Sequence, residues 1–237
     1  MIGQFKEGVI IGDFDSRSEG LRLVDRSDFP PSQKEMKENI PFVHGEYDFS
    51  KILGEVFYSN RTVSYVFYQQ YNPYSTRKVN KIYLQNKLLN KFNVRIYDTA
   101  KPGYYYRGKV SKIDVTDVHS KNRLEINLEL DCYPFMISDL MEGHDIWDEF
   151  NFELDVAQPT EFDVRGNTEI ILYNVGNTSV VPTIITDSEF RIEMGNLSMT
   201  VPHGTSKNEL FRLEIGENKL EIYGNGNIKF NYYKELV

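Results

Sequence analysis

The sequence predicts a mainly β protein, in which an N-terminal β-sandwich-like domain with one helix is followed by an antiparallel β-sandwich. Three observations favour this fold class. Short segments with alternating or β-branched residues recur along the chain between turn residues. Only one segment has the spacing of an amphipathic helix. The 237 residues also include 16 Tyr and 15 Phe, which favour half-buried strands and are common at interfaces.

Charge is divided unevenly along the chain. The formal net charge is -8, but residues 1–136 carry 20 basic and 17 acidic side chains, whereas residues 137–237 carry 7 basic and 18 acidic ones. We therefore expect two domains with these bounds, although the length also suits one large β domain. The net negative charge disfavours a general nucleic-acid coat and a binder of anionic membranes.

The N-terminal part reads as strands that precede the helix. We expect strands at residues 8–14 and 21–24, then a loop that begins at Pro30-Pro31 and continues to residue 39, since two prolines block both helix and central strand. An extended segment with a Gly turn covers residues 40–50. Strands at 56–58 and 61–68 follow, and the second places Val63, Tyr65 and Phe67 on one face.

The helix is expected near residues 76–92, with Ser75 or Thr76 as its cap. Its apolar residues recur at helical spacing and are expected to face a sheet: Val79, Ile82, Tyr83, Leu88, Leu89 and Phe92. The lysines of the helix fall mostly on a different face: Lys78, Lys81, Lys87 and Lys91. We expect this face to be exposed to solvent, and a second interpretation is that it binds nucleic acid.

A strand and a hairpin follow the helix. The strand covers residues 94–97, and the arms of the hairpin cover residues 104–118 and 123–131, joined by a polar loop. In the second strand of this hairpin apolar residues alternate with polar ones, which predicts that one face is buried and the other is exposed to solvent.

The C-terminal part is a series of short strands separated by Gly/Asn turns, which predicts a sandwich or jelly roll. We expect the hairpin turn Gly224-Asn225-Gly226 among these turns, and strands at residues 152–156, 162–165, 169–173, 183–186, 190–193, 197–201, 210–215, 219–223 and 228–233.

No catalytic or metal-binding motif stands out in the sequence. The four histidines are widely separated, the single Cys132 excludes an intrachain disulfide and a cysteine-based zinc cluster, and no nucleophile elbow, P-loop or Rossmann glycine pattern is found. Cys132 is expected to be a packed thiol. The acidic residues around Trp147 lack the features of a glycosidase pair. We expect no enzyme, no cofactor, no secretion signal and no membrane span.

The order of features points to a family. Residues 41–50, PFVHGEYDFS, form an extended segment with a Pro, a Gly and an Asp-x-Ser-like turn, and Tyr58, Arg61 and the strand at 63–67 follow before the helix. This run resembles the distal tail proteins (Dit) of long-tailed phages, the siphophages. Similarity continues in the C-terminal part, at residues 174–177, 181–184 and 220–232.

This resemblance implies a structural protein of the phage tail tip, the baseplate hub. The N-terminal domain is expected to assemble into a homo-hexameric ring with a central channel for DNA passage, and the C-terminal domain to be a galectin-like β-sandwich. Expected partners are the tail tube protein, the tail-associated lysin and receptor-binding or baseplate proteins, without sequence-specific nucleic-acid or membrane binding. Assembly in the host bacterial cytoplasm and a place at the virion tail tip are implied too.

Five residues are expected to form the ring interface, Phe42, Tyr47, Phe49, Arg61 and Tyr65, although packing within one subunit explains them as well. Two other functions compete with the hub. A galectin-like sandwich suits a carbohydrate-binding module for host cell-wall glycan, but the sugar-binding galectin motifs are absent. A wall hydrolase using Asp148 or Glu149 is the third reading.

Overall fold

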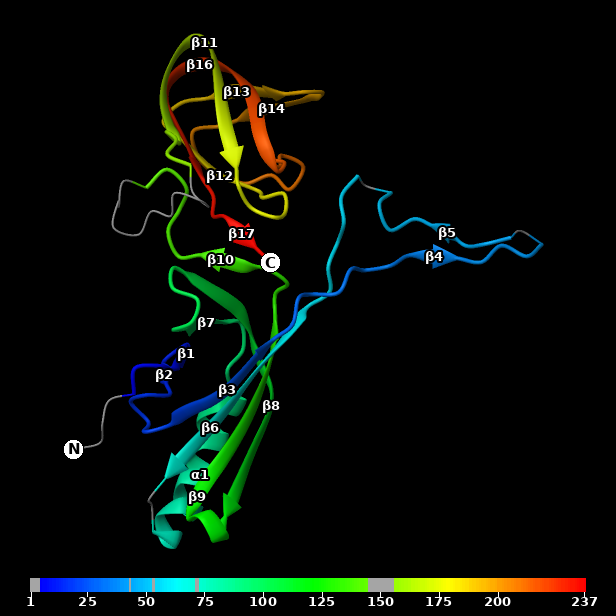
Figure 1. The fold of residues 1–237 in the computed structure, drawn as a ribbon. Helices are drawn as coiled ribbons and strands as arrows, with labels where there is room; N and C mark the ends of the chain where they lie inside the picture. Colours follow the sequence, from blue (N-terminus) through cyan, green and yellow to red (C-terminus); the bar gives the residue numbers. More distant parts are fainter. Residues whose placement is uncertain (1–4, 43, 53, 71–72, 145–155) are drawn as a thin grey trace. The chain divides into compact units, whose positions relative to one another are not determined.

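The computed structural model describes residues 5–42, 44–52, 54–70, 73–144 and 156–237. The chain divides into two compact units, unit 1 with residues 1–136 and Val237, and unit 2 with residues 137–236. Figure 1 shows that both units consist of strands and that the α-helix belongs to unit 1. The predicted mainly β fold is confirmed. The expected strand at 152–156 and the acidic residues around Trp147 lie outside the described residues, apart from the exposed Val156.

Unit 1 is built on an antiparallel sheet with the strand order β2-β1-β7-β8-β9-β6-β3. Its strands are β1 (Val9–Ile11), β2 (Phe14–Asp15), β3 (Arg22–Asp28), β6 (Arg61–Gln70), β7 (Val94–Asp98), β8 (Tyr104–Val118) and β9 (Arg123–Cys132), with the short 3-10 helix η1 (His119–Lys121) between the last two. The hairpin β8–β9 confirms the expected one. The expected first strand is instead divided into β1 and β2, because Gly12 turns the chain at φ 61°.

Alternating strands form the core of unit 1. Val63, Tyr65 and Phe67 of β6 are buried on one face, as predicted, and the apolar residues of β9 alternate with more exposed polar ones. The paired strands β6 and β9 bring these two apolar rows side by side. The sheet therefore follows the period-two pattern of the sequence.

The helix α1 (Tyr74–Leu89) covers part of this sheet but turns another face to it than predicted. Only Arg77, Leu84 and Leu88 are buried, while Val79 and Ile82 are 66% and 61% exposed. Tyr83, Leu89 and the following Phe92 are exposed as well, so the expected burial is wrong for five of the six apolar residues. The buried face instead combines Leu84 and Leu88 with Arg77, which pairs with Asp117 of β8 at 2.8 Å.

The start of the helix also differs. Pro73 precedes the first turn and no side chain caps it, so neither Ser75 nor Thr76 is the cap.

Unit 2 is a six-stranded antiparallel sheet around the long strand β16 (Gly216–Asn231). The strand β11 (Glu161–Asn174) pairs along its whole length with β16. On its other edge the first half of β16 pairs with β13 (Phe190–Met194) and the second half with β12 (Thr183–Thr186). The remaining strands are β14 (Leu197–Val201) and β15 (Gly204–Ser206), and β10 (Met136–Ser138) pairs with β17 (Glu235–Leu236).

The predicted hairpin turn at Gly224-Asn225-Gly226 is wrong, because β16 runs through it without reversing. Gly224 and Gly226 have φ of 150° and 134°, and Gly166 of β11 lies opposite Gly224. The glycines bend the two paired strands instead of ending them. The bent pair encloses an apolar core that includes Phe190, Phe211 and Phe230.

Candidate interaction surface

A long hairpin leaves the sheet of unit 1 between β3 and β6. We call its residues 29–60 the arm. Its limbs are held by the pairing of β4 (Lys37–Glu38) with β5 (Tyr47–Asp48), and by backbone hydrogen bonds from Lys34 to Phe57 and from Phe49 to Met36. Figure 1 shows the arm leading away from the sheet. The expected loop at 32–39 is therefore one limb of a hairpin, and part of it is strand.

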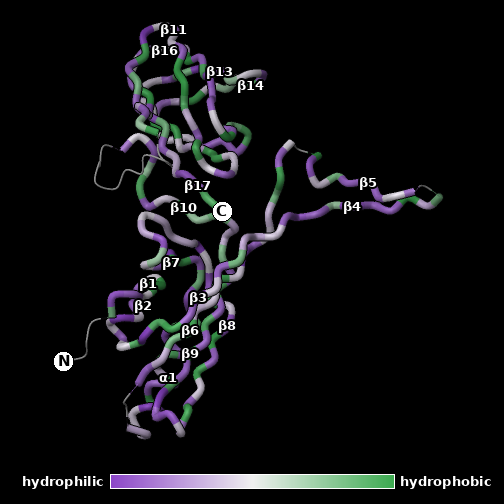
Figure 2. The backbone as a smooth tube through the Cα atoms, in the orientation of Figure 1, coloured by the Kyte–Doolittle hydropathy of each residue, from purple (hydrophilic) through white to green (hydrophobic). Residues whose placement is uncertain are grey.

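Apolar side chains along the arm are exposed. They are Phe29, Met36, Ile40, Phe42, Tyr47, Phe49, Ile52 and Phe57. Figure 2 shows hydrophobic segments at the tip of the arm and near its return to the sheet. Phe42 is fully exposed, and the rings of Tyr47 and Phe49 stack on each other with centroids 6.3 Å apart. Exposed apolar surface of this extent is typical of an element that binds a partner.

An ion pair closes the base of the arm. Asp28 is the last residue of β3 and Arg61 the first of β6, and Arg61 Nη2 donates to Asp28 Oδ1 at 2.7 Å. The same guanidinium donates to the carbonyl oxygens of Phe29, at 3.1 Å from Nη2, and Pro134, at 3.2 Å from Nη1. Arg61 thus holds both limbs where they leave the sheet.

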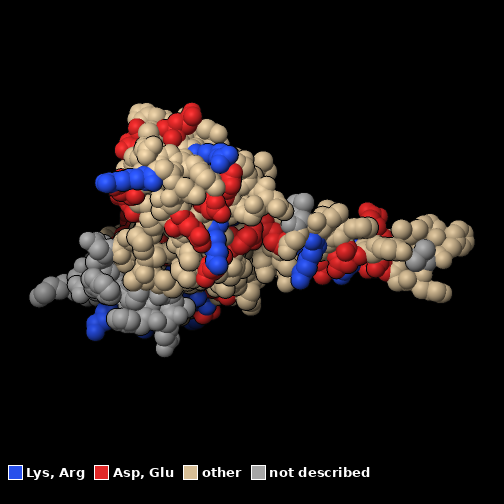
Figure 3. All heavy atoms as spheres, turned by 90° about the horizontal axis from the view of Figure 1, so that it is seen from above, with Lys and Arg blue, Asp and Glu red and all other residues tan. Residues whose placement is uncertain are grey.

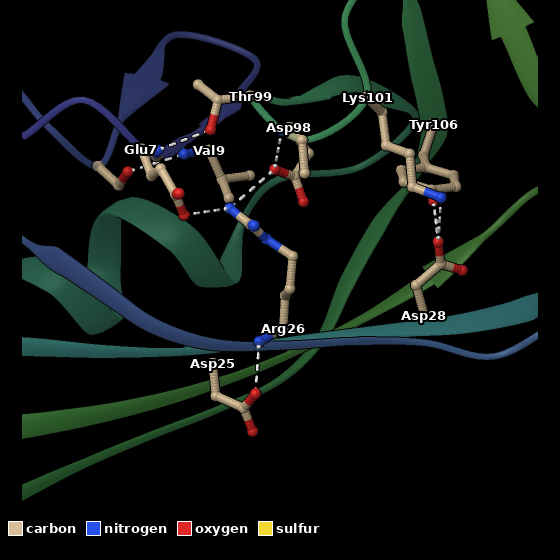
Figure 4. Close-up of polar contacts among 12 residues, drawn as sticks. Glu7, Val9, Asp25, Arg26, Asp28, Asp98, Thr99, Lys101 and Tyr106 are labelled. Carbon is tan, nitrogen blue, oxygen red and sulfur yellow. Dashed lines mark hydrogen bonds and ion pairs between the residues drawn. The ribbon is translucent and has the colours of Figure 1, made fainter.

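Two further groups reach Asp28, as Figure 4 shows. The hydroxyl of Tyr106 donates to Oδ2 at 2.6 Å, and Lys101 Nζ lies 3.1 Å from the same oxygen. Burial works against the charge of Asp28, but these hydrogen bonds and the positive charges of Arg61 and Lys101 outweigh it and hold the pKa of Asp28 below its usual value. Burial and the bond to Asp28 raise the pKa of Tyr106.

A second polar group lies beside the first. Arg26 Nη2 lies 3.1 Å from Glu7 and 3.4 Å from the buried Asp98 (Figure 4). Tyr65 is buried in this region, and burial together with the charge of Asp98 raises the pKa of its hydroxyl. These contacts tie β3 to β7, so the strand that leads into the arm is anchored on two sides.

The structure separates the five residues expected at a ring interface. Phe42, Tyr47 and Phe49 are exposed on the arm, whereas Arg61 and Tyr65 are 4% and 1% exposed inside unit 1. The side chains of the last two are thus inaccessible to a neighbouring subunit, and Arg61 positions the arm. Asp28, its partner, was not among the expected site residues; the Asp28-Phe29-Pro30-Pro31 run, which marks the end of β3, is the sequence signal for it.

Unit 2 contains a shallow pocket of about 520 Å³. Its lining combines apolar and charged residues without an aromatic ring: Met194, Gly195, Leu197, Leu210, Arg212, Glu214, Glu217, Asn218 and Lys219. Among the described residues no cluster of His, Cys, Asp and Glu could hold a metal ion. No described helix has the length and apolar character needed to cross a membrane.

Solved structures include one with the same fold. The Dit protein (gp 19.1) of phage SPP1 aligns with 98% of this chain and 100% of its own, with a TM-score of 0.68 and 13% identity. This chain has the fold of SPP1 Dit. Chains of the phage p2 baseplate in its activated conformation, with Sr or Ca, align with 96% and 97% of this chain and 97% and 98% of their own, at TM-scores of 0.39 and 0.40 and identities of 10% and 11%.

The likeness to SPP1 Dit lies in the fold rather than in the sequence. No protein-family model matches the chain, and no curated protein matches it. The resemblance to the Dit proteins that the order of sequence features indicated is thus confirmed at the level of the fold.

Proposed function

We propose that this chain is a structural, non-enzymatic subunit of a phage tail tip. In this proposal six copies form a ring, the baseplate hub, which joins the tail tube to the adsorption apparatus and leaves a central channel for DNA. The tail tube protein binds one side, and the tail-associated lysin and receptor-binding or baseplate proteins bind elsewhere. The ring assembles in the host cytoplasm and resides at the tail tip of the virion.

The arm is the observation that carries this proposal. A ring requires a heterologous contact, in which one surface of a subunit fits a different surface of the next. The eight exposed apolar side chains of this projecting hairpin add little to the core of their own subunit, but supply such a surface. The fold supports the setting, since SPP1 Dit is described as a paradigm of the hub adsorption apparatus in phages that infect Gram-positive bacteria.

Phe42, Tyr47 and Phe49 are the residues we assign to the ring contact. Arg61 and Tyr65 act within the subunit, where Arg61 fixes the base of the arm through Asp28. This division explains why a charged side chain is buried at the root of an exposed element. The cost of burying the guanidinium is offset by hydrogen bonds to two carbonyl oxygens and to the carboxylate of Asp28.

Light scattering and negative-stain microscopy of the purified chain test the ring. We expect a species six times the mass of the 27.7 kDa chain and ring-shaped particles. A variant in which a Gly/Ser linker replaces residues 33–58 should remain folded and monomeric. A monodisperse wild-type monomer at tens of micromolar, with no rings, would contradict the proposal. Immunogold labelling of intact phage particles tests the location independently, and label away from the tail tip contradicts it.

Glycan binding by unit 2 is the alternative function. The pocket of unit 2 has no aromatic ring among its lining residues on which a sugar could stack. A glycan array with the full-length chain separates the two functions, since we expect no bound glycan. Clear binding that an Asn218→Ala exchange in the pocket abolishes would favour the alternative.

A further inference from the structure

An exposed face of α1 is mostly apolar, although the hydroxyl of Tyr83 donates to Glu19 Oε1 at 3.0 Å. Residues 79, 82, 83 and 89 lie on one side of a helix with 3.6 residues per turn, opposite residues 77, 84 and 88, which face the sheet. Val79, Ile82, Tyr83 and Leu89 are exposed there, and Phe92 continues the apolar surface beyond the helix. We call these five residues the helix face. A surface helix normally places such residues inward.

Charge distinguishes the helix face from the arm. Residues 74–92 contain five basic side chains and no acidic one, whereas residues 33–58 contain five acidic side chains and three lysines. Lys87 forms an ion pair with Glu19, and Lys91 forms one with Asp13. Lys78 and Lys81 have no ion-pair partner among the described residues. Figure 3 shows acidic side chains along the arm.

The two surfaces also match in length. The 16 residues of α1 span about 24 Å. The limb of the arm from Gln33 to Phe42 spans about 30 Å when extended. One arm can therefore follow the whole helix face, with apolar residues over apolar residues and carboxylates beside lysines.

The arm and the helix face lie at opposite ends of β6. The arm returns to the sheet at Arg61, whereas the helix follows Gln70, about 30 Å away along the strand. Figure 1 shows the arm leading away from α1. The arm at one end of the sheet and the helix face at the other are two different surfaces, and a contact between them suits two copies of the chain.

We propose that the arm of one copy binds the helix face of the neighbouring copy. In this contact Phe42, Tyr47 and Ile52 pack over Val79, Ile82 and Leu89. The arm carboxylates, such as those of Glu46 and Asp48, approach Lys78 and Lys81. This inference deepens the proposed ring and rests on it, because it names the surface that receives the arm.

Disulfide cross-linking tests the contact directly. Phe42→Cys or Tyr47→Cys is combined with Val79→Cys, Ile82→Cys or Leu89→Cys in a second batch of the chain, and the two are mixed under mild oxidation. We expect cross-linked dimers in the mixtures but not in the separate variants. Carrying Phe42→Cys and Ile82→Cys in one chain should give a ladder that ends at six copies.

The native cysteine does not interfere, because Cys132 is fully buried and its burial raises its pKa to about 12. The matched control pairs Phe42→Cys with Thr205→Cys, an exposed position in β15 of unit 2, and should give no cross-link.

Charge reversal gives a second, independent readout. The double change Lys78→Glu and Lys81→Glu should weaken assembly at least tenfold, as should Glu46→Lys with Asp48→Lys. All four changes in one chain should restore it. The circular dichroism spectrum should stay unchanged, since all four changes are at side chains on the surface.

The outcomes separate this inference from the ring itself. Rings that form without arm-to-helix cross-links, or that survive Ile82→Asp and the charge reversals, overturn the helix face as the acceptor and leave the ring standing. A wild-type chain that forms no rings overturns the ring proposal and this inference together.

Discussion

Asp28 and Arg61 bind each other across the base of the arm; they are 33 positions apart in sequence, and 2.7 Å separates Oδ1 from Nη2. One ends β3 and the other begins β6, so the pair connects the points where the arm leaves and rejoins the sheet. Tyr106 and Lys101 hold the carboxylate from β8 and the preceding loop. The base of the arm is thus held by side chains that lie outside the arm.

Arg61→Ala should lower the free energy of unfolding of unit 1 by about 3 kcal/mol, because it leaves the carboxylate of Asp28 with one cation fewer and removes the donor to Phe29 and Pro134. Urea unfolding followed by circular dichroism measures the loss, and hydrogen exchange should rise in residues 29–60. Arg165→Ala, which breaks an exposed pair with Asp163, is the control and should change stability by less than about 0.5 kcal/mol. Equal effects of the two changes would show that the base of the arm is not held by Arg61.

Asp28 should make unit 1 sensitive to acid. Its folded-state pKa is lowered, so its stabilising contribution is fully present above the unfolded pKa of about 4 and is lost as pH falls through the folded value. The stability difference between wild type and Asp28→Asn should therefore be constant from about pH 7 to pH 5 and shrink below about pH 4. Urea unfolding at a series of pH values measures it. A difference that stays constant to pH 2 contradicts the lowered pKa.

The sequence predicted the strands of unit 1 well where the physical cause is local. In β9 the residues Leu124, Ile126, Leu128 and Leu130 alternate with polar ones, and period-two geometry alone sends them to one side. The helix was located within a few residues for the same reason. Its buried face was not predicted, because that face includes the charged Arg77, whose partner Asp117 is 40 residues away in sequence.

The candidate interaction surface likewise depends on contacts between residues far apart in sequence, which the sequence alone does not reveal. Phe42, Tyr47 and Phe49 were expected at a ring interface because they are aromatic residues in the segment that resembles the Dit proteins, and the structure exposes all three. Arg61 was chosen with them but lies inside the subunit, and only the three-dimensional pairing with Asp28 shows its role. In unit 2 the glycines at 224 and 226 gave the signal of a hairpin turn, although β16 continues through them.

Gly224→Ala should destabilise unit 2 by about 1–3 kcal/mol. A Cβ at this position would lie 2.5 Å from Cδ1 of the buried Phe190, and the φ of 150° is a conformation that residues with side chains rarely adopt. Thermal unfolding measures the loss. Gly166→Ala is the matched control, because Gly166 pairs with Gly224 and has a positive φ but open space around it. Gly166→Ala should lower the stability of unit 2 by less than Gly224→Ala does. An equal loss of stability would assign the effect of Gly224→Ala to backbone strain alone.

Phe42→Ser and Phe49→Ser should together break the ring without weakening the fold. Both side chains are exposed on the arm, so their loss removes apolar contact area with a neighbour and little from the core of the subunit. Sedimentation velocity should show the six-copy species replaced by smaller ones, while the thermal midpoint of the dissociated subunit stays that of the arm-deleted chain. Leu210→Ser removes an exposed apolar side chain from unit 2 and should leave the ring intact. Rings that persist in the double variant would remove these two aromatics from the contact, and rings lost in Leu210→Ser would place part of the contact on unit 2.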